Sequence, residues 1–130
     1  MPAVVPPMFD HDDAFFWAGA AEGRLLIKRC LGCDRLRNPP TPMCAECRSV
    51  EWDAVESSGR GTVYSWVVSQ HPTEPDAAPR VVVLVDLDEG IRLVSNLLDV
   101  APGDVMNGMT VEVCFEQYGD VTLPQFRPVP

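Results

Sequence analysis

The two stretches CLGC (residues 30–33) and CAEC (residues 44–47) are the most informative segments of this 130-residue chain, and ten residues separate them. In each stretch a two-residue gap allows one tight turn to direct both sulfurs at the same metal ion. Two such turns, held together by a short ribbon, complete a tetrahedron. The spacing therefore predicts one structural Zn2+ near the N-terminus, bound by Cys30, Cys33, Cys44 and Cys47.

All four ligand positions of this predicted site are supplied by protein, so none remains for water or substrate, which indicates a structural metal rather than a catalytic one. An iron–sulfur cluster or a mononuclear iron also uses four thiolates, and four free thiols are the remaining interpretation. Asp34 and Arg48 follow the second cysteine of each pair, where a left-handed backbone favours glycine.

The basic residues Lys28, Arg29, Arg35, Arg37 and Arg48 lie near the cysteines in sequence. The simpler interpretation is that they offset the thiolate charge and stay in solvent. Alternatively, some of them contact an anionic ligand such as the phosphates of coenzyme A, or an acidic partner surface, with Arg35 and Arg37 as the candidates.

The formal net charge of −9 is unevenly distributed, because residues 61–130 hold three basic and ten acidic residues. Arg80, Arg92 and Arg127 are the basic residues of this part. Proteins that bind nucleic acid usually neutralise phosphates with a basic stripe, so this balance argues against that class of function.

The longest strongly apolar run, residues 81–85, is too short to cross a bilayer. The N-terminus lacks the basic and long apolar regions of a signal peptide. We therefore expect a cytoplasmic protein that does not enter membranes and whose cysteines are thiols or metal ligands.

Residues 1–10 are rich in proline and are predicted to be extended or poorly ordered. A short helix is predicted next, with Asp10 or His11 as its cap and Gly23 as its stop. Its aromatic residues can dock on the chain's own core or on a partner. We name Phe15, Phe16 and Trp17 as candidate partner-interface residues.

The rest of the pattern predicts short strands. One strand at 25–29 leads into the first cysteine pair, and Gly59-Arg60-Gly61 is interpreted as a break before five more, at 62–69, 80–88, 91–99, 110–118 and 121–126. Tight turns are predicted at residues 89–90 and 119–120, and a short helical turn within residues 101–108. This arrangement predicts a mainly β protein with an N-terminal helix, a zinc ribbon and a C-terminal five-stranded OB-fold barrel. We place the segments at 1–29, 30–58 and 59–130.

Catalytic motifs are absent from the sequence: it has no nucleophile elbow, phosphate-binding glycine loop or His-Glu metal helix. Cys114 is expected to be a buried structural thiol, and His11 and His71 to be cap or loop residues rather than catalysts.

Taken in order, these residues resemble a known family, the zinc-ribbon plus OB-fold proteins called domain-of-unknown-function 35, over about residues 12–128. The elements that carry the resemblance are Phe15-Phe16-Trp17, Glu22-Gly23-Arg24-Leu25, Arg29-Cys30 with Cys33, Pro39-Pro40, Cys44 with Cys47, Trp52, Gly59-Arg60-Gly61-Thr62-Val63-Tyr64-Ser65, Leu87-Asp88-Glu89-Gly90, Gly108-Met109-Thr110-Val111 and Leu123-Pro124-Gln125-Phe126. Thr41 and Ala45 depart from the family pattern, which often has arginine and proline there.

The resemblance implies a non-catalytic accessory subunit that forms a hetero-oligomer with a thiolase-like acyl-CoA enzyme. One branch of the family partners an aldolase that cleaves steroid side-chain CoA thioesters by a retro-aldol step, and some branches are fused to a hydratase-type domain. The alternatives are a stand-alone acyl-CoA-binding protein and, third, a nucleic-acid-binding zinc-ribbon and OB module.

Overall fold

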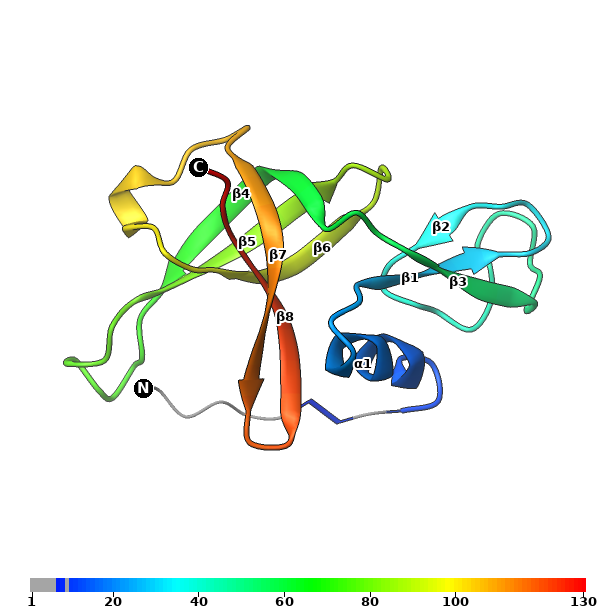
Figure 1. Cartoon of the computed structure of the whole chain (residues 1–130), viewed down its shortest axis with the longest axis horizontal. Helices are drawn as coiled ribbons and strands as arrows, with labels where there is room; N and C mark the ends of the chain where they lie inside the picture. Colours follow the sequence, from blue (N-terminus) through cyan, green and yellow to red (C-terminus); the bar gives the residue numbers. More distant parts are fainter. Residues whose placement is uncertain (1–6, 9) are drawn as a thin grey trace.

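The computed structural model describes residues 7–8 and 10–130 and consists of one helix, a small three-stranded sheet and a closed barrel within that range (Figure 1). The predicted fold class is therefore confirmed. The described elements are α1 (Ala14–Ala21), β1 (Leu26–Cys30), β2 (Leu36–Arg37), β3 (Trp52–Glu56), β4 (Arg60–Ser69), β5 (Arg80–Leu87), β6 (Arg92–Leu97), the 3-10 helix η1 (Pro102–Asp104), β7 (Thr110–Tyr118) and β8 (Val121–Pro128). Most of the proline-rich segment 1–10 lies outside the described residues.

The N-cap residue of α1 is Asp13, so neither of the predicted caps, Asp10 and His11, takes that position. Asp10 instead caps the turn that precedes the helix. Its carboxylate accepts hydrogen bonds from the amides of Asp12 and Asp13, and its own amide donates to the carboxylate of Asp13. This reciprocal arrangement is a capping box built from two aspartates. Because Asp10 also accepts the first helical bond, from Ala14, the helical path begins one turn before the assigned helix.

The helix ends at Gly23, as predicted, in a Schellman motif. The amide of Arg24 bonds to the carbonyl of Gly19, and the amide of Gly23 bonds to that of Ala20. Gly23 has a φ of 74°, which is available to glycine at little cost. The chain then enters β1 directly.

The ribbon sheet has the order β2-β1-β3, with both pairs antiparallel. The sequence analysis predicted β1 to within one residue but missed β2 and β3. β2 is two residues long, which is too short to leave a periodic pattern. β3 has no fully buried face, so its extended state depends on pairing with β1 rather than on its own residues.

The five barrel strands follow the order β4-β5-β6-β8-β7 and close through β4 and β7, the topology of an OB fold. All neighbours are antiparallel except β6 and β8, which run parallel and meet at Leu97 and Phe126. The core contains mainly branched aliphatic residues, with Phe126 fully buried at its centre. Leu25 and Ile27, from the segment that enters the ribbon, belong to the same buried cluster.

The predicted break at residues 59–61 is present between β3 and β4 but ends at Gly59, which has a φ of 78°. Arg60 and Gly61 already belong to β4. Gly61 pairs with Leu87 on one side and Val111 on the other. A Cβ atom here would lie 2.3 Å from the carbonyl oxygen of Asp86. Glycine is therefore required by the close approach of β5, not by a turn.

Two contacts fix the ribbon against the barrel. The Glu89 carboxylate, in the turn between β5 and β6, accepts bonds from the hydroxyl of Ser57 and the amide of Ser58. On the other side, the side-chain amide of Asn38 donates to the carbonyl of Arg92 at 2.9 Å. In the described part of the chain, no helix has both the length and the apolar character needed to cross a membrane.

Candidate metal centre and apolar groove

The four predicted cysteine ligands converge at one end of the ribbon, with all four sulfurs within 4.8 Å of one another. The Sγ atoms of Cys30 and Cys47 are 3.4 Å apart, and those of Cys33 and Cys44 are 3.7 Å apart. Sulfurs at about 2.3 Å from a tetrahedral zinc lie about 3.8 Å from each other. The cluster therefore fits one structural Zn2+, with two buried and two exposed ligands.

The backbone after each cysteine pair takes the conformation that the spacing predicts. Asp34 and Arg48 have φ values of 65° and 63°. The amide of Asp34 bonds to the carbonyl of Cys30, and the amide of Arg48 bonds to that of Cys44, so each pair forms the same turn. These two turns aim the sulfurs at a common point.

The protein environment prepares part of the cluster for metal. Hydrogen bonds from the amides of Cys47 and Glu46 lower the pKa of Cys44 to about 6, which favours the thiolate that a zinc ligand requires. The amide of Arg35 acts in the same direction on Cys33, but burial and the neighbouring sulfurs prevail and raise the pKa of this thiol to about 12. A bound Zn2+ would replace the protons on these neighbouring sulfurs and so allow Cys33 to be a thiolate as well.

Lys28 does not stay in solvent, as the simpler interpretation of the basic residues expected. It is only 2% exposed, and its Nζ atom lies 4.2 Å from the centroid of the Trp52 ring and 5.7 Å from that of Phe15. The carbonyls of Pro40 and Thr41 accept its hydrogen bonds at 3.5 and 3.4 Å. Burial, followed by the charge of Arg37, lowers the pKa of Lys28.

Arg35 and Arg37, the candidate phosphate contacts, differ in accessibility. Arg35 is exposed and lies 4.0 Å from the carboxylate of Glu46. Arg37 donates from Nε to the carbonyl of Thr41, while both of its terminal nitrogens are covered and have no hydrogen-bond partner among the described residues. The guanidinium of Arg35 is therefore accessible to solvent, whereas the terminal nitrogens of Arg37 are not.

The aromatic residues of α1 separate into two groups. Phe15 packs on Trp52 of β3, with ring centroids 4.8 Å apart. Phe16 and Trp17 contact each other edge to face at 5.0 Å and line a groove on the barrel. The three predicted interface residues are thus half-buried, and the groove is the surface that two of them share.

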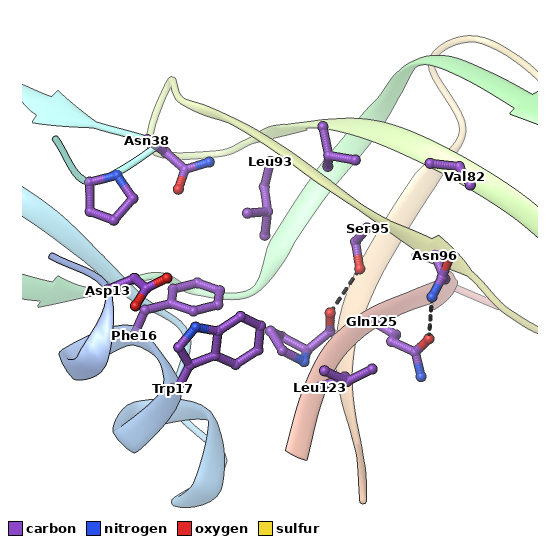
Figure 2. Close-up of a pocket in the computed structure, with 13 residues that line it drawn as sticks. Asp13, Phe16, Trp17, Asn38, Val82, Leu93, Ser95, Asn96, Leu123 and Gln125 are labelled. Atoms are coloured by element: carbon purple, nitrogen blue, oxygen red, sulfur yellow. Dashed lines mark hydrogen bonds between the residues drawn. The ribbon is translucent and has the colours of Figure 1, made fainter. Parts of the chain in front are cut away.

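This groove has a volume of about 370 Å3 and lies between α1, the loop after β2 and the outer surface of β5, β6 and β8 (Figure 2). Its apolar residues include Phe16, Trp17, Leu93, Val94 and Leu123. No signal in the sequence indicated it, because its walls come from five separate segments.

Three polar side chains of the groove, those of Ser95, Asn96 and Gln125, are hydrogen-bonded within its lining (Figure 2). Ser95 donates to the carbonyl of Pro124, and Asn96 donates to the side chain of Gln125, both at 2.8 Å. Gln125 in turn donates to the hydroxyl of Tyr118. The lining therefore offers a mainly apolar surface to any occupant.

The surroundings of Cys114, His71 and His11 are those of structural rather than catalytic residues. Cys114 is half-buried, and burial followed by the charge of Glu116 raises the pKa of its thiol, which disfavours a reactive thiolate. His71 accepts a bond from the amide of Thr73 within its own exposed loop, as expected of a loop residue. His11 is exposed in the turn before α1.

Two family models match successive parts of the chain. Residues 17–53 match the model described as the ChsH2 rubredoxin-like zinc ribbon domain, and residues 54–116 match the model of the ChsH2 C-terminal OB-fold domain. Among curated relatives, a DUF35 domain-containing scaffold protein of Methanocaldococcus jannaschii is 35% identical over 105 residues, which cover 78% of this chain and 74% of that protein.

Two further relatives are longer proteins. The probable enoyl-CoA hydratase alpha subunit of Thermomonospora curvata is 46% identical over 124 residues, 94% of this chain. The 3-oxo-4,17-pregnadiene-20-carboxyl-CoA hydratase alpha subunit of Mycobacterium tuberculosis is 39% identical over 127 residues, 97% of this chain. The chain spans only 39% and 40% of the lengths of these two relatives.

Solved structures agree with the family models. A chain of the Ltp2-ChsH2(DUF35) aldolase superimposes with a TM-score of 0.87 at 45% identity, covering 94% of this chain and 98% of that one. A DUF35 protein of unknown function from Sulfolobus solfataricus shares the fold at 17% identity, with a TM-score of 0.67 and coverage of 92% and 86%.

Proposed function

This chain belongs to the ChsH2 (DUF35) family of zinc-ribbon and OB-fold proteins, and from that premise we propose that it is the non-catalytic subunit of an acyl-CoA enzyme that degrades steroid side chains. The observation that carries the proposal is the similarity to the ChsH2 chain of the Ltp2-ChsH2(DUF35) aldolase, which extends over 98% of that chain at 45% identity. We propose the aldolase as the enzyme served, with a thiolase-like partner that supplies the catalytic residues.

The metal centre supports a non-catalytic role. Its four ligands are thiolates of this chain, so the ion has no open position at which to activate water or polarise a carbonyl. When bound, zinc supplies stability to the ribbon. Cys114 and His71 lie outside the metal cluster, in surroundings that disfavour catalysis.

The groove supports a role beside an apolar substrate. Its volume of about 370 Å3 lies within the range of small-molecule sites, and the polar side chains of Ser95, Asn96 and Gln125 are already hydrogen-bonded within the lining. We propose that it receives an apolar part of the acyl group while the partner holds the reacting carbons. Arg35, which is exposed, is the phosphate contact in this proposal, whereas the terminal nitrogens of Arg37 are covered.

Hydration is a second candidate activity, because two relatives are named as hydratase alpha subunits. The two activities are chemically adjacent. Hydrating an enoyl-CoA gives a 3-hydroxyacyl thioester, and the Cα–Cβ bond of such a thioester is the bond that a retro-aldol step breaks. Because this chain spans about two fifths of those relatives, we favour the aldolase, whose ChsH2 chain it covers almost completely.

Nucleic-acid binding is the least supported alternative. OB folds bind oligonucleotides across the surface of their second and third strands, which are β5 and β6 here. That surface borders the groove and lies beside α1, and residues 61–130 carry a net charge of −7. Phosphates would therefore meet apolar side chains and repulsion rather than a basic stripe.

The test is co-expression of this chain with Ltp2, the other component named for the solved aldolase, followed by purification and assay. The substrate is a steroid side-chain 3-hydroxyacyl-CoA, and the readout is release of the ketone and the shortened CoA thioester. We expect a stable complex that cleaves the substrate, with little cleavage by either protein alone. If the two proteins do not copurify and cleavage is unchanged without this chain, the proposal is wrong. Hydration of the enoyl-CoA in place of cleavage would favour the second activity.

A further inference from the structure

Strand β4 has an open edge over its second half. It pairs with β7 only through residues 60–62, and the register shifts between Val63 and Ser65. Beyond this bulge, residues 65–69 pair with β5 on one side (Figure 1). In the described part of the chain no other strand pairs with the opposite side of this segment.

The register identifies which backbone groups face the open side. The amide of Leu87 in β5 donates to the carbonyl of Ile91 across the hairpin, so the backbone groups of Leu87 point toward β6. The amides and carbonyls of successive residues in an antiparallel strand point to opposite sides. Those of residues 80, 82 and 84 therefore point toward β4, where these residues pair with residues 69, 67 and 65. The amides and carbonyls of Trp66 and Val68 consequently point away from β5, toward the open side.

The side chains along this edge lack the usual protection against strand addition. Val67 and Val68 are 62% and 48% exposed, although successive residues of a strand lie on opposite faces. The segment 65–69 contains no charged residue and no proline, the devices by which edge strands normally prevent pairing with other chains. We therefore expect this apolar edge to pair with a further strand.

We propose that the β4 edge binds an extended strand of a different polypeptide, which pairs with the backbone of Trp66 and Val68 and packs apolar side chains against Val67 and Val68. Strand addition of this kind takes its affinity from main-chain hydrogen bonds and its specificity from alternate side chains. The inference rests on the proposed function for the existence of a partner, and goes beyond it in naming the surface and the form of the segment bound.

The acidic charge of this chain favours a strand from a different protein over a strand from a second copy of the chain. Residues 61–130 have a net charge of −7, and Glu74 and Asp76 lie in the loop that continues from β4. Two copies joined edge to edge would bring these acidic regions together. A strand flanked by basic residues is electrostatically complementary to the same surface.

The test uses two variants of one residue and Ltp2 as the probe. Val68→Pro removes an amide that does not bond to β5, so the barrel should still fold, as circular dichroism would verify. We expect its affinity for Ltp2 to fall about tenfold or more, the equivalent of about 1.4 kcal/mol. Val68→Thr keeps the amide and the branched shape but loses part of the apolar contact, so it should bind Ltp2 more tightly than Val68→Pro, and the difference between the two variants reports the main-chain bond.

Hydrogen exchange gives a second, independent readout. In the isolated chain the amides of Trp66 and Val68 should exchange rapidly, while those of Val67 and Ser69 should be protected by β5. In the complex with Ltp2, the first two should become protected as well. If Trp66 and Val68 are already protected in the monomeric chain, the edge is covered by its own residues and the inference is wrong.

The outcomes separate this inference from the proposed function. If the wild type binds Ltp2 and Val68→Pro binds equally well, the edge is not the interface, while the proposed function stands. If the wild type does not bind Ltp2, the result counts against both. If the chain alone dimerises and Val68→Pro makes it monomeric, the occupant is a second copy, and the foreign strand is excluded.

Discussion

The hydroxyl of Ser57 donates a hydrogen bond to the carboxylate of Glu89 at 2.5 Å, across the junction of ribbon and barrel. The second carboxylate oxygen accepts from the amide of Ser58 at 3.0 Å. The oxygen of Ser57 also accepts from the amide of Gly59. One side chain on the β5–β6 turn therefore organises the whole segment that connects β3 to β4.

Glu89→Ala should destabilise the chain by about 1–2 kcal/mol, because it leaves the hydroxyl of the buried Ser57 and the amide of Ser58 without their acceptor. Urea unfolding followed by tryptophan fluorescence measures the change. Glu116→Ala, at an exposed position on β7, is the matched control and should change stability little. Equal losses in the two variants would mean that the junction does not depend on Glu89.

The same carboxylate predicts a pH dependence. Burial acts to raise the pKa of Glu89, but the bonds from Ser57 and Ser58 outweigh it, and the folded-state pKa lies below the ordinary value of 4.5. A depressed carboxyl pKa stabilises the fold above the unfolded pKa, and this stabilisation is lost as the pH falls through the folded pKa. The stability advantage of wild type over Glu89→Gln should thus hold at pH 6 and shrink below about pH 4.5. An advantage that grows on acidification would contradict this assignment.

Cys33→Ser should remove the metal and unfold the ribbon, since three thiolates no longer close the tetrahedron. Zinc content by mass spectrometry and copurification with Ltp2 measure the two effects. Cys114→Ser is the control, because Cys114 lies on β7 outside the metal cluster, and it should keep one zinc per chain. A Cys33→Ser protein that lost zinc yet bound Ltp2 normally would show that the ribbon does not support association.

Arg48→Gly should stabilise the zinc-bound ribbon by about 0.5–1 kcal/mol. Arg48 has a φ of 63°, a backbone conformation in which a residue with a Cβ atom is strained by about 1–2 kcal/mol. Glycine removes this strain but loses more conformational entropy on folding, which offsets part of the gain. Competition with a zinc chelator and thermal unfolding provide the measurement. Val50, two residues away, does not have a positive φ, so Val50→Gly relieves no strain and should destabilise the protein.

Val94→Asp should weaken binding of an apolar acyl chain without unfolding the barrel. Val94 is 65% exposed and lines the groove, so a charge there remains hydrated when the groove is empty and becomes costly when it is filled. Calorimetry of the purified Ltp2 complex with a steroid acyl-CoA and with free CoA separates the apolar contribution. Binding of free CoA should be unchanged, and loss of both ligands together would argue against the groove as the acyl site.

Much of the architecture was accessible from the sequence, because its determinants are local. The cysteine spacing identified the metal cluster, Gly23 identified the C-terminal end of α1, and the predicted turns at residues 89–90 and 119–120 join the observed strands. Each of these features is set by residues at most 17 positions apart, the separation of Cys30 and Cys47. The segment boundaries at 29/30 and 58/59 stay a prediction, although β1 itself runs across the first of them.

Apart from the two-residue strand β2 and the N-cap residue of α1, the features that the sequence analysis missed depend on distant partners. Gly61 resembled a turn residue because nothing nearby indicates that Asp86 approaches it. Lys28 was expected in solvent because the aromatic rings that cover it come from α1 and β3. The groove likewise forms only when α1 packs beside β8. Hydrophobic pattern reports which face of an element is buried, but not which element covers it.

Strand β1 and the residue before it contribute to two structures at once, with Leu25 and Ile27 in the barrel core and Cys30, three residues later, in the metal cluster. Metal occupancy and barrel stability are therefore thermodynamically linked through one short segment of backbone. Because zinc binds the folded ribbon more tightly than the unfolded chain, the melting temperature of the barrel should rise with free zinc concentration, although no ligand of the metal lies in the barrel.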